Sequence, residues 1–298
     1  MLRRLVLTRT TGQLGNRLMV GAHVLAAAAD IGATCLNPAF LEYSDWFEGP
    51  RRSLATWIPG ISSPRTYALG QRRLTYAATR VAWEASKVVG PLSLGRIARA
   101  RARNRDPQDL KVVVERAQAG GASTLLLQGY HFRHAPWAQR HAGLLREFFL
   151  PCVKHRGPAE AVVGELRRTC DVVVAVHLRH GDYKTHLDGR FFWEVPIYRG
   201  FIERIRGLLA PANVGFLVCS NARHSPEDFT GLTWKPGPGS VAGDLYAMSR
   251  CDFVLGPPSS FSSWAAFQGG AKLLRITNAD QAFTLDDFAV QDAPETLW

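Results

Sequence analysis

The chain has 298 residues, 46% of them hydrophobic and 20% charged, with a formal net charge of +11 and a pI near 9.9. This is the composition of a globular protein, and the length suits two domains. No apolar run reaches the roughly 18 residues that a membrane span needs. The positive charge predicts attraction to an anionic partner, whether nucleotide phosphates, nucleic acid or an acidic membrane surface.

The N-terminus has no signal-peptide pattern, because no apolar segment and small-residue cleavage site follow its basic residues. Five scattered cysteines, with no CxxC pair, predict reduced structural thiols. These features indicate a cytoplasmic protein.

The first half opens as a βαβ unit, with a turn around Gly12 and Gly15 between strand and helix. The pattern gives no assignment over residues 37–107. Strands are expected at 5–8, 33–36 and 125–128, and helices at 18–29 and 139–149.

Residues 151–158, with two prolines and a glycine, predict a linker. A second α/β series follows it, which gives expected domains at 1–155 and 156–298. Strands are expected at 172–176, 214–219, 253–255 and 272–276, and helices at 198–209, 243–249 and 262–268. Two doubly wound, Rossmann-like domains facing a cleft are the predicted fold.

Residues 172–183 (VVVAVHLRHGDY) are the most informative stretch. The Val/Ala run predicts a strand buried on both faces, and ligands bind beyond the carboxyl ends of such strands. His177 and Arg179 are therefore placed to hold an anionic ligand. Alternatively, Arg179 pairs with Asp182 at a loop corner.

Two helix starts are candidate anion sites. Residues 10–17 (TTGQLGNR) turn a strand into a helix, although a plain turn is favoured for this motif alone. Residues 243–264 place Asp244 at one helix start, and Ser259 and Ser260 at another, where hydroxyls and backbone amides suit a diphosphate. Alternatively, Asp244 and one of the serines are simple N-caps. Capping is compatible with ligand binding, which is favoured only in combination with the other motifs.

Five arginines crowd a short segment, and a solvated surface helix is favoured over a membrane-binding or nucleic-acid-binding one. They are Arg96, Arg99, Arg101, Arg103 and Arg105. No GxSxG, HExxH, Cys/His ligand spacing or DxD occurs, so neither a metal nor another cofactor is expected.

Five segments together resemble, in order, the motifs of the GDP-fucose-dependent bacterial α-1,2-fucosyltransferases. The HLRHGDY of 177–183 is similar to HxRRGDY, and 244–264 is similar to DLYLMSxCxxxIxxxSSFSWW. The other three are GQLGNR (12–17), similar to GGLGNQ; LQGYHFRHAPW (127–137), similar to LxGYxQSxxYF; and FLVCSN (216–221), similar to FxxFSDD.

The resemblance implies a GT-B fold with a donor-binding second domain and an acceptor-side first domain. It implies that His177 contacts the nucleoside, Arg179 the diphosphate and Asp244 the guanine edge. The remaining donor-site residues that it implies are Gly12, Leu14, Gly15, Asn16, Ser220, Asn221, Ser259, Ser260 and Phe261. Three departures from the family pattern are His180 for Arg, Asn221 for Asp and Ser263 for Trp.

The expected activity is inverting, metal-independent transfer of fucose, or a related sugar, from GDP-fucose to a glycan hydroxyl. Asp182, then His180, are the candidate bases. Alternatives are a protein, lipid-linked or small-molecule acceptor, or a non-catalytic nucleotide- or nucleic-acid-binding protein. The expected partners are the GDP-sugar and the glycan acceptor, without nucleic acid, and with peripheral contact to an anionic inner membrane face left open.

Overall fold

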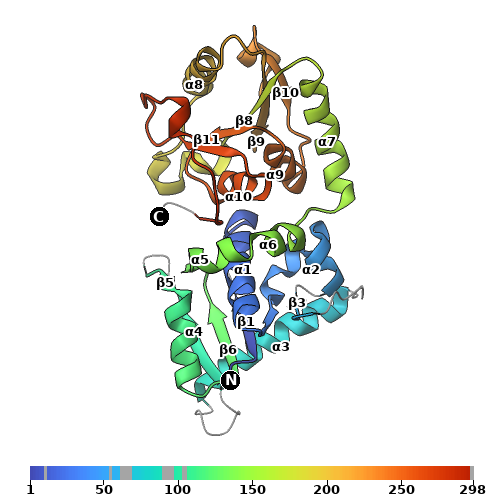
Figure 1. The fold of residues 1–298 in the computed structure, drawn as a ribbon, viewed down its shortest axis with the longest axis vertical. Coiled ribbons are helices and arrows are strands. Elements are labelled where there is room, and N and C mark those ends of the chain that lie inside the picture. The colour runs from blue at the N-terminus through green and yellow to red at the C-terminus, as the bar shows by residue number, and fades with distance from the viewer. Residues whose placement is uncertain (10–11, 54–55, 61–68, 89–96, 103–105, 296–298) are drawn as a thin grey trace. The chain divides into compact units, whose positions relative to one another are not determined.

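The computed structural model describes residues 1–9, 12–53, 56–60, 69–88, 97–102 and 106–295. The chain forms two compact units, Met1–Cys152 and Val153–Trp298, each built on its own largely parallel sheet with flanking helices (Figure 1). The expected α/β class with two Rossmann-like units is confirmed.

The first unit holds a five-stranded sheet in the order β3-β2-β1-β6-β4, in which β3 is antiparallel to β2 and the other pairs are parallel. Its strands are β1 (Arg4–Arg9), β2 (Thr34–Leu36), β3 (Thr56–Trp57), β4 (Ile97–Arg101) and β6 (Thr124–Gln128), with the separate pair β5 (Gln108–Asp109) and β7 (Phe132–Arg133). Its helices are α1 (Leu14–Asp30), η1 (Pro38–Trp46), α2 (Glu48–Ser53), α3 (Leu69–Val88), α4 (Leu110–Ala119), α5 (Ala135–Arg140) and α6 (Ala142–Phe148).

Helix α1 is buried along almost its whole length, which explains its run of alanines. Small side chains let it pack closely on all sides. At Gly21 an added Cβ would lie 2.9 Å from the Asn37 amide nitrogen and 3.2 Å from the Phe149 ring, so the close approach requires glycine.

Two expectations for this unit are wrong. The helix expected over 139–149 is divided into α5 and α6 at His141. The basic segment is the edge strand β4 rather than a surface helix, with Arg99 and Arg101 exposed; Arg96, Arg103 and Arg105 lie outside the described residues. The side chains of a strand alternate between its two faces, and the Ile-Ala-Arg-Ala-Arg sequence fits this alternation. Pairing with β6 then stabilises the segment as a strand.

The second unit holds a fully parallel sheet in the order β10-β9-β8-β11-β12. Its strands are β8 (Val172–Leu178), β9 (Val214–Ser220), β10 (Thr233–Pro236), β11 (Phe253–Gly256) and β12 (Lys272–Arg275). Its helices are α7 (Val153–Arg167), η2 (Gly181–Lys184), η3 (His186–Gly189), α8 (Val195–Leu208), η4 (Pro226–Phe229), α9 (Val241–Ser249), α10 (Ser260–Gly269) and η5 (Leu285–Asp287).

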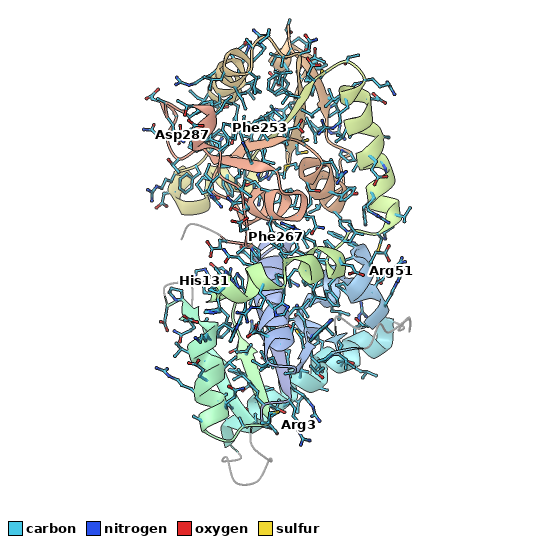
Figure 2. All side chains as sticks on the ribbon, in the orientation of Figure 1. Arg3, Arg51, His131, Phe253, Phe267 and Asp287 are labelled. Carbon is cyan, nitrogen blue, oxygen red and sulfur yellow. The ribbon has the colours of Figure 1, made fainter. Side chains whose placement is uncertain are left out.

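The central strand β8 separates two halves of this unit's core. Val174, Val176 and Leu178 face one cluster, which includes Tyr198, Phe201 and Ile202 of α8. Because strand side chains alternate, His177 points to the opposite side of the sheet, where its ring meets that of Phe261 in α10. Two further aromatic residues, the partly buried Phe253 and the fully buried Phe267, are labelled in Figure 2.

The linker expected over 151–158 is wrong, because α7 begins at Val153 and contains Pro158. A proline there removes one intrahelical hydrogen bond. Burial of Ala159, Val163 and Leu166 on the inner face of α7 compensates for that loss.

All five cysteines are free and buried, as expected for structural thiols. Burial raises the pKa of Cys35 to about 12, so this thiol stays protonated and unreactive. Among the described helices, none is long and apolar enough to cross a membrane.

Candidate functional site

The second unit's expected site residues gather at the carboxyl edge of its sheet. Since all five strands are parallel, the loops after β8, β9 and β11 emerge on the same side. These loops carry the segments that begin at Arg179, Asn221 and Pro257. The structure therefore brings together three motifs that lie about 40 residues apart in sequence.

His177 is a buried, neutral imidazole at the end of β8. It is 3% exposed, its ring centroid lies 5.3 Å from that of Phe261, and its Nδ1 atom is buried without a hydrogen-bond partner. Burial, reinforced by the charge of Arg179, lowers its pKa to about 3. A buried polar atom without a partner is uncommon, and a bound ligand or an ordered water would satisfy it.

Arg179 is half-buried in the loop after β8, where two tyrosines hold it. Its backbone N–H donates to the Tyr198 hydroxyl at 3.4 Å, and its guanidinium carbon lies 5.0 Å from the centre of the Tyr183 ring. A cation over an aromatic face is attracted to it. The arrangement positions a fixed positive charge at the edge of the sheet. The side chain of Asp182, the alternative partner of Arg179, lies outside the described residues.

His180 and Asn221 fasten the loops after β8 and β9 to each other. The backbone N–H of His180 donates to the side-chain Oδ1 of Asn221 at 2.9 Å, and the side-chain Nδ2 of Asn221 donates back to the backbone carbonyl of His180 at 3.2 Å. Gly181 has a φ of +53°, and a Cβ there would lie 2.7 Å from the Asn221 amide nitrogen. Asn221, which stands where the similar fucosyltransferase motif has Asp, therefore supplies the N–H donor for this contact between the two loops.

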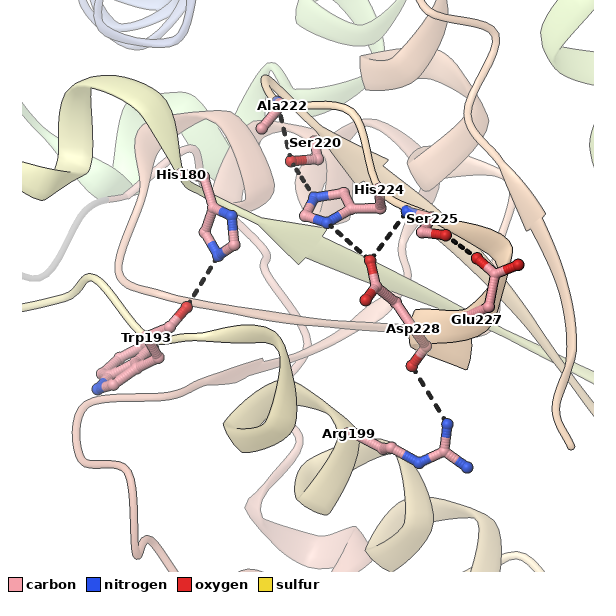
Figure 3. A network of polar contacts seen from close by, with 9 residues as sticks. All are labelled: His180, Trp193, Arg199, Ser220, Ala222, His224, Ser225, Glu227 and Asp228. Atoms are coloured by element: carbon pink, nitrogen blue, oxygen red, sulfur yellow. Dashed lines mark hydrogen bonds and ion pairs between the residues drawn. The ribbon is translucent and has the colours of Figure 1, made fainter. Parts of the chain in front are cut away.

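The His180 ring is also engaged by its surroundings. Its Nε2 donates to the Trp193 carbonyl oxygen at 2.8 Å (Figure 3). Its ring also packs beside those of Phe192 and His224. These contacts give His180 a structural part in the wall of the site.

Ser220, at the end of β9, is held by a histidine that the sequence analysis missed. Its Oγ lies 2.9 Å from Nε2 of His224 and accepts from the N–H of Ala222 (Figure 3). Nδ1 of His224 lies 3.8 Å from Asp228, which is beyond hydrogen-bond range, so the three residues do not form a nucleophilic triad. The four-residue spacing of Ser220, His224 and Asp228 is the only signal of this network in the sequence.

Asp244 lies in the first turn of α9, and its Oδ1 accepts from the N–H of Gly239 at 2.9 Å. Ser240, not Asp244, is the N-cap of α9, so the capping interpretation of Asp244 is wrong. Burial raises the pKa of Asp244 to about 6, and the Gly239 N–H opposes that rise. A Cβ at Gly237 would lie 2.6 Å from Oδ1, so the loop before α9 passes close to the carboxylate.

Ser259 is the N-cap of α10, as one interpretation expected, and its Oγ accepts from the Phe261 N–H at 3.2 Å. Ser259 is buried, whereas Ser260 and Phe261 are half-buried. The cap leaves the Ser259 hydroxyl proton available for donation, and the N-terminal end of a helix favours anions.

In the first unit, the turn between β1 and α1 carries the expected glycine motif. Gly12 has a φ of +86°, and a Cβ there would lie 2.3 Å from the Asn16 amide nitrogen. Leu14 and Gly15 are buried in the first turn of α1, and Asn16 is half-buried. Arg17 donates to the Gly12 carbonyl at 3.1 Å, which fixes the turn. Thr10 and Thr11 of this motif lie outside the described residues.

Among the residues that the structure describes, no three His, Cys, Asp or Glu side chains form a candidate metal-binding group. No protein-family model and no curated protein matches the sequence.

The two Rossmann-like units have the GT-B fold of the fucosyltransferases. A variant of Arabidopsis thaliana FUT1 in complex with GDP matches at a TM-score of 0.59 and 14% identity, covering 94% of this chain and 72% of that one. NodZ α-1,6-fucosyltransferase soaked with GDP-fucose matches at 0.54 and 17%, covering 97% of each chain. Fucosyltransferase NodZ from Bradyrhizobium matches at 0.54 and 15%, covering 92% of this chain and 96% of that one.

These likenesses confirm the expected resemblance at the level of the fold. They do not distinguish α-1,2 from other linkages, because NodZ is named as an α-1,6 enzyme.

Proposed function

We propose that the protein is a GDP-sugar-dependent glycosyltransferase that moves fucose, or a related sugar, from GDP-fucose to a hydroxyl of a glycan. The observation that carries this proposal is the position of Arg179. It places a fixed cation beside the neutral imidazole of His177, whose Nδ1 has no hydrogen-bond partner, at the carboxyl edge of a parallel sheet. Solved structures with this fold hold GDP or GDP-fucose, which supports the choice of nucleotide.

The proposed donor site follows from the chemistry of each group. The Arg179 guanidinium donates to the diphosphate oxygens, and the Ser259 hydroxyl, Ser260 and the start of α10 add donors around them. The Asp244 carboxylate accepts from guanine N1–H and N2–H. His177 and Phe261 form the adjoining wall against the nucleoside. Ser220 presents its hydroxyl from the end of β9.

In the proposed inverting reaction the acceptor hydroxyl attacks the anomeric carbon of the sugar, the bond to the diphosphate oxygen breaks, and GDP leaves with the electron pair. Negative charge grows on the diphosphate, and Arg179 is placed to stabilise it without a metal. The hydroxyl proton passes to a base, for which we propose Asp182. His180 is the weaker candidate, because its Nε2 is already bonded to Trp193.

The first unit is proposed to supply the acceptor side, and Gly12, Leu14, Gly15 and Asn16 to approach the donor from it. An α-1,2 linkage is part of the proposal on the strength of the HLRHGDY and SSFSSW motifs.

Ligand-induced stabilisation tests the nucleotide preference. A ligand that binds the folded state raises the melting temperature. We expect GDP and GDP-fucose, without added divalent cation, to raise it more than UDP, ADP or CDP. Equal shifts for all four diphosphates would refute the guanine assignment. RNA binding without any shift by GDP would instead favour a non-catalytic nucleic-acid-binding protein.

A further inference from the structure

The net positive charge of the protein belongs to its first unit alone. Met1–Cys152 holds 21 of the 36 Lys and Arg and 9 of the 25 Asp and Glu, a formal net charge of +12. Val153–Trp298 holds the other 15 and 16, a net charge of −1. The proposed donor site lies mainly in the second unit. It therefore does not account for the excess positive charge of the first unit, which points to a separate anionic partner for that unit.

Helix α3 presents an apolar surface to solvent on this basic unit. Leu74 is 72% exposed and Val81 is 67% exposed, and they are two of the most exposed large hydrophobic side chains among the described residues. Seven residues apart, they lie on one face of the helix, with exposed Ala77 and Ala78 between them. The opposite face is the packed one, because Trp83 is buried against Val6 and Leu126 of the sheet.

Cations border this apolar face. Arg73 and Arg80 are exposed and lie seven residues apart, which places them on one flank of the Leu74–Val81 face. Lys87 continues this flank and is paired with the exposed carboxylate of Glu84. The neighbouring edge strand adds two more: Ile97 packs with Trp83, and the alternation of β4 sends Arg99 and Arg101 to the same side of the sheet as α3.

An exposed apolar face bordered by cations matches the surface of an anionic bilayer, which offers a hydrocarbon boundary beneath negative headgroups. A nucleic-acid surface would use the cations but gain nothing from Leu74 and Val81. Single-strand binding commonly adds exposed aromatic rings. None of the strongly exposed hydrophobic side chains in the described part of the chain is aromatic.

We propose that the outward face of α3, with Arg99 and Arg101 of β4 beside it, docks the protein onto an anionic lipid bilayer. The apolar side chains enter the headgroup boundary while the cations pair with lipid phosphates. The apolar part of this surface comes from α3, and the two described arginines of the basic segment, Arg99 and Arg101, contribute from a strand rather than from a helix.

Vesicle co-sedimentation tests this surface. We expect the full chain to bind vesicles containing phosphatidylglycerol, more weakly at high salt, and not to bind pure phosphatidylcholine. The double variants L74D/V81D and R73E/R80E should each weaken binding by about tenfold or more. The matched controls V290D and K272E, both at exposed positions of the second unit, should bind as the wild type does.

Two readouts keep the result interpretable. An unchanged melting temperature, and an unchanged shift with GDP, show that each variant is folded. Wild-type binding by L74D/V81D, or binding to both kinds of vesicle alike, would overturn the proposal. A stronger affinity for poly(U) RNA, lost in R73E/R80E but kept in L74D/V81D, would also overturn it and assign the surface to a polyanion.

Discussion

The hydroxyl of Tyr183 donates a hydrogen bond of 3.1 Å to the carbonyl oxygen of Pro258. This bond joins the loop after β8 to the turn that precedes α10. The same tyrosine ring lies under the Arg179 guanidinium, so one buried side chain couples the proposed diphosphate cation to the proposed phosphate-binding helix start.

Tyr183→Phe should therefore separate the two functions of this residue. The ring stays under Arg179, while the Pro258 carbonyl loses its partner at a cost of about 1 to 2 kcal/mol in unfolding free energy. Tyr183→Leu removes the ring as well, and it should weaken GDP binding more than Tyr183→Phe does. Urea denaturation and GDP titration measure the two effects. Equal GDP affinity in both variants would show that the ring does not position Arg179.

GDP affinity should depend on the protonation of Asp244. Its pKa is raised to about 6, so the carboxylate is ionised at pH 7.5 and gains a proton as the pH falls through 6. Protonation removes an acceptor for the guanine N–H groups, and affinity should fall by up to about tenfold per pH unit below that point. Calorimetric titration between pH 5 and 8 measures it.

Asp244→Asn is the control for that pH dependence. It should weaken GDP binding at pH 7.5 by roughly tenfold or more and abolish the part of the pH dependence that belongs to Asp244. Titration of the ligand itself remains in both proteins. If wild type and variant show the same pH profile, Asp244 does not bind the base.

His177 should make the folded state sensitive to acid. Its pKa is lowered from 6.5 to about 3, so between those values the unfolded chain binds a proton that the folded chain does not. The free energy of unfolding therefore rises with pH across this window. The contribution of His177 is fully present above pH 6.5 and is lost as the pH falls towards 3. The contribution is on the order of a few kcal/mol.

The measurement is the difference in unfolding free energy between wild type and His177→Gln as a function of pH. We expect the wild type to lose stability relative to the variant from pH 7 to pH 4. A difference that stays constant over this range would contradict the neutral, buried state of His177.

Gly256 allows the end of β11 to approach β8. A Cβ at this position would lie 2.8 Å from the His177 carbonyl oxygen, which is backbone and has little freedom to move. Gly256→Ala should destabilise the protein by about 1 to 3 kcal/mol and weaken GDP binding through displacement of His177. Gly200→Ala in α8, where nothing lies within 4 Å, is the matched control and should be neutral or slightly stabilising in thermal unfolding. Equal stability of the two variants would disprove the packing argument.

The sequence predicts elements whose pattern is local. The apolar run of β8 and the serine cap at the start of α10 are visible in the residues themselves. Strand β10 could not be predicted, because Thr-Trp-Lys-Pro is short, largely exposed and stabilised by its pairing with β9. Helix α3 falls in a segment where the basic and aromatic composition hid the helical period.

Candidate site residues could be proposed from the sequence where a motif adjoins a strongly patterned element. His177 and Arg179 lie at the end of β8, Asp244 lies in the first turn of α9, and Ser259 and Ser260 lie at the start of α10. His224 could not be found in this way, because it reaches Ser220 from a loop with no periodicity. The capping residue of α9 was likewise assigned wrongly, since Ser240 and Asp244 are both good N-terminal residues and only backbone geometry separates them.

The most direct test of the account is the rate of sugar transfer from GDP-fucose by Arg179→Ala, with Arg179→Lys and the exposed Arg206→Ala beside it. We expect Arg179→Ala to lower the rate of transfer by about 100-fold or more. Arg179→Lys should lower it partially, because lysine keeps the charge but not the bidentate geometry of the guanidinium, and Arg206→Ala should leave it unchanged. Transfer by Arg179→Ala at the wild-type rate would contradict the account.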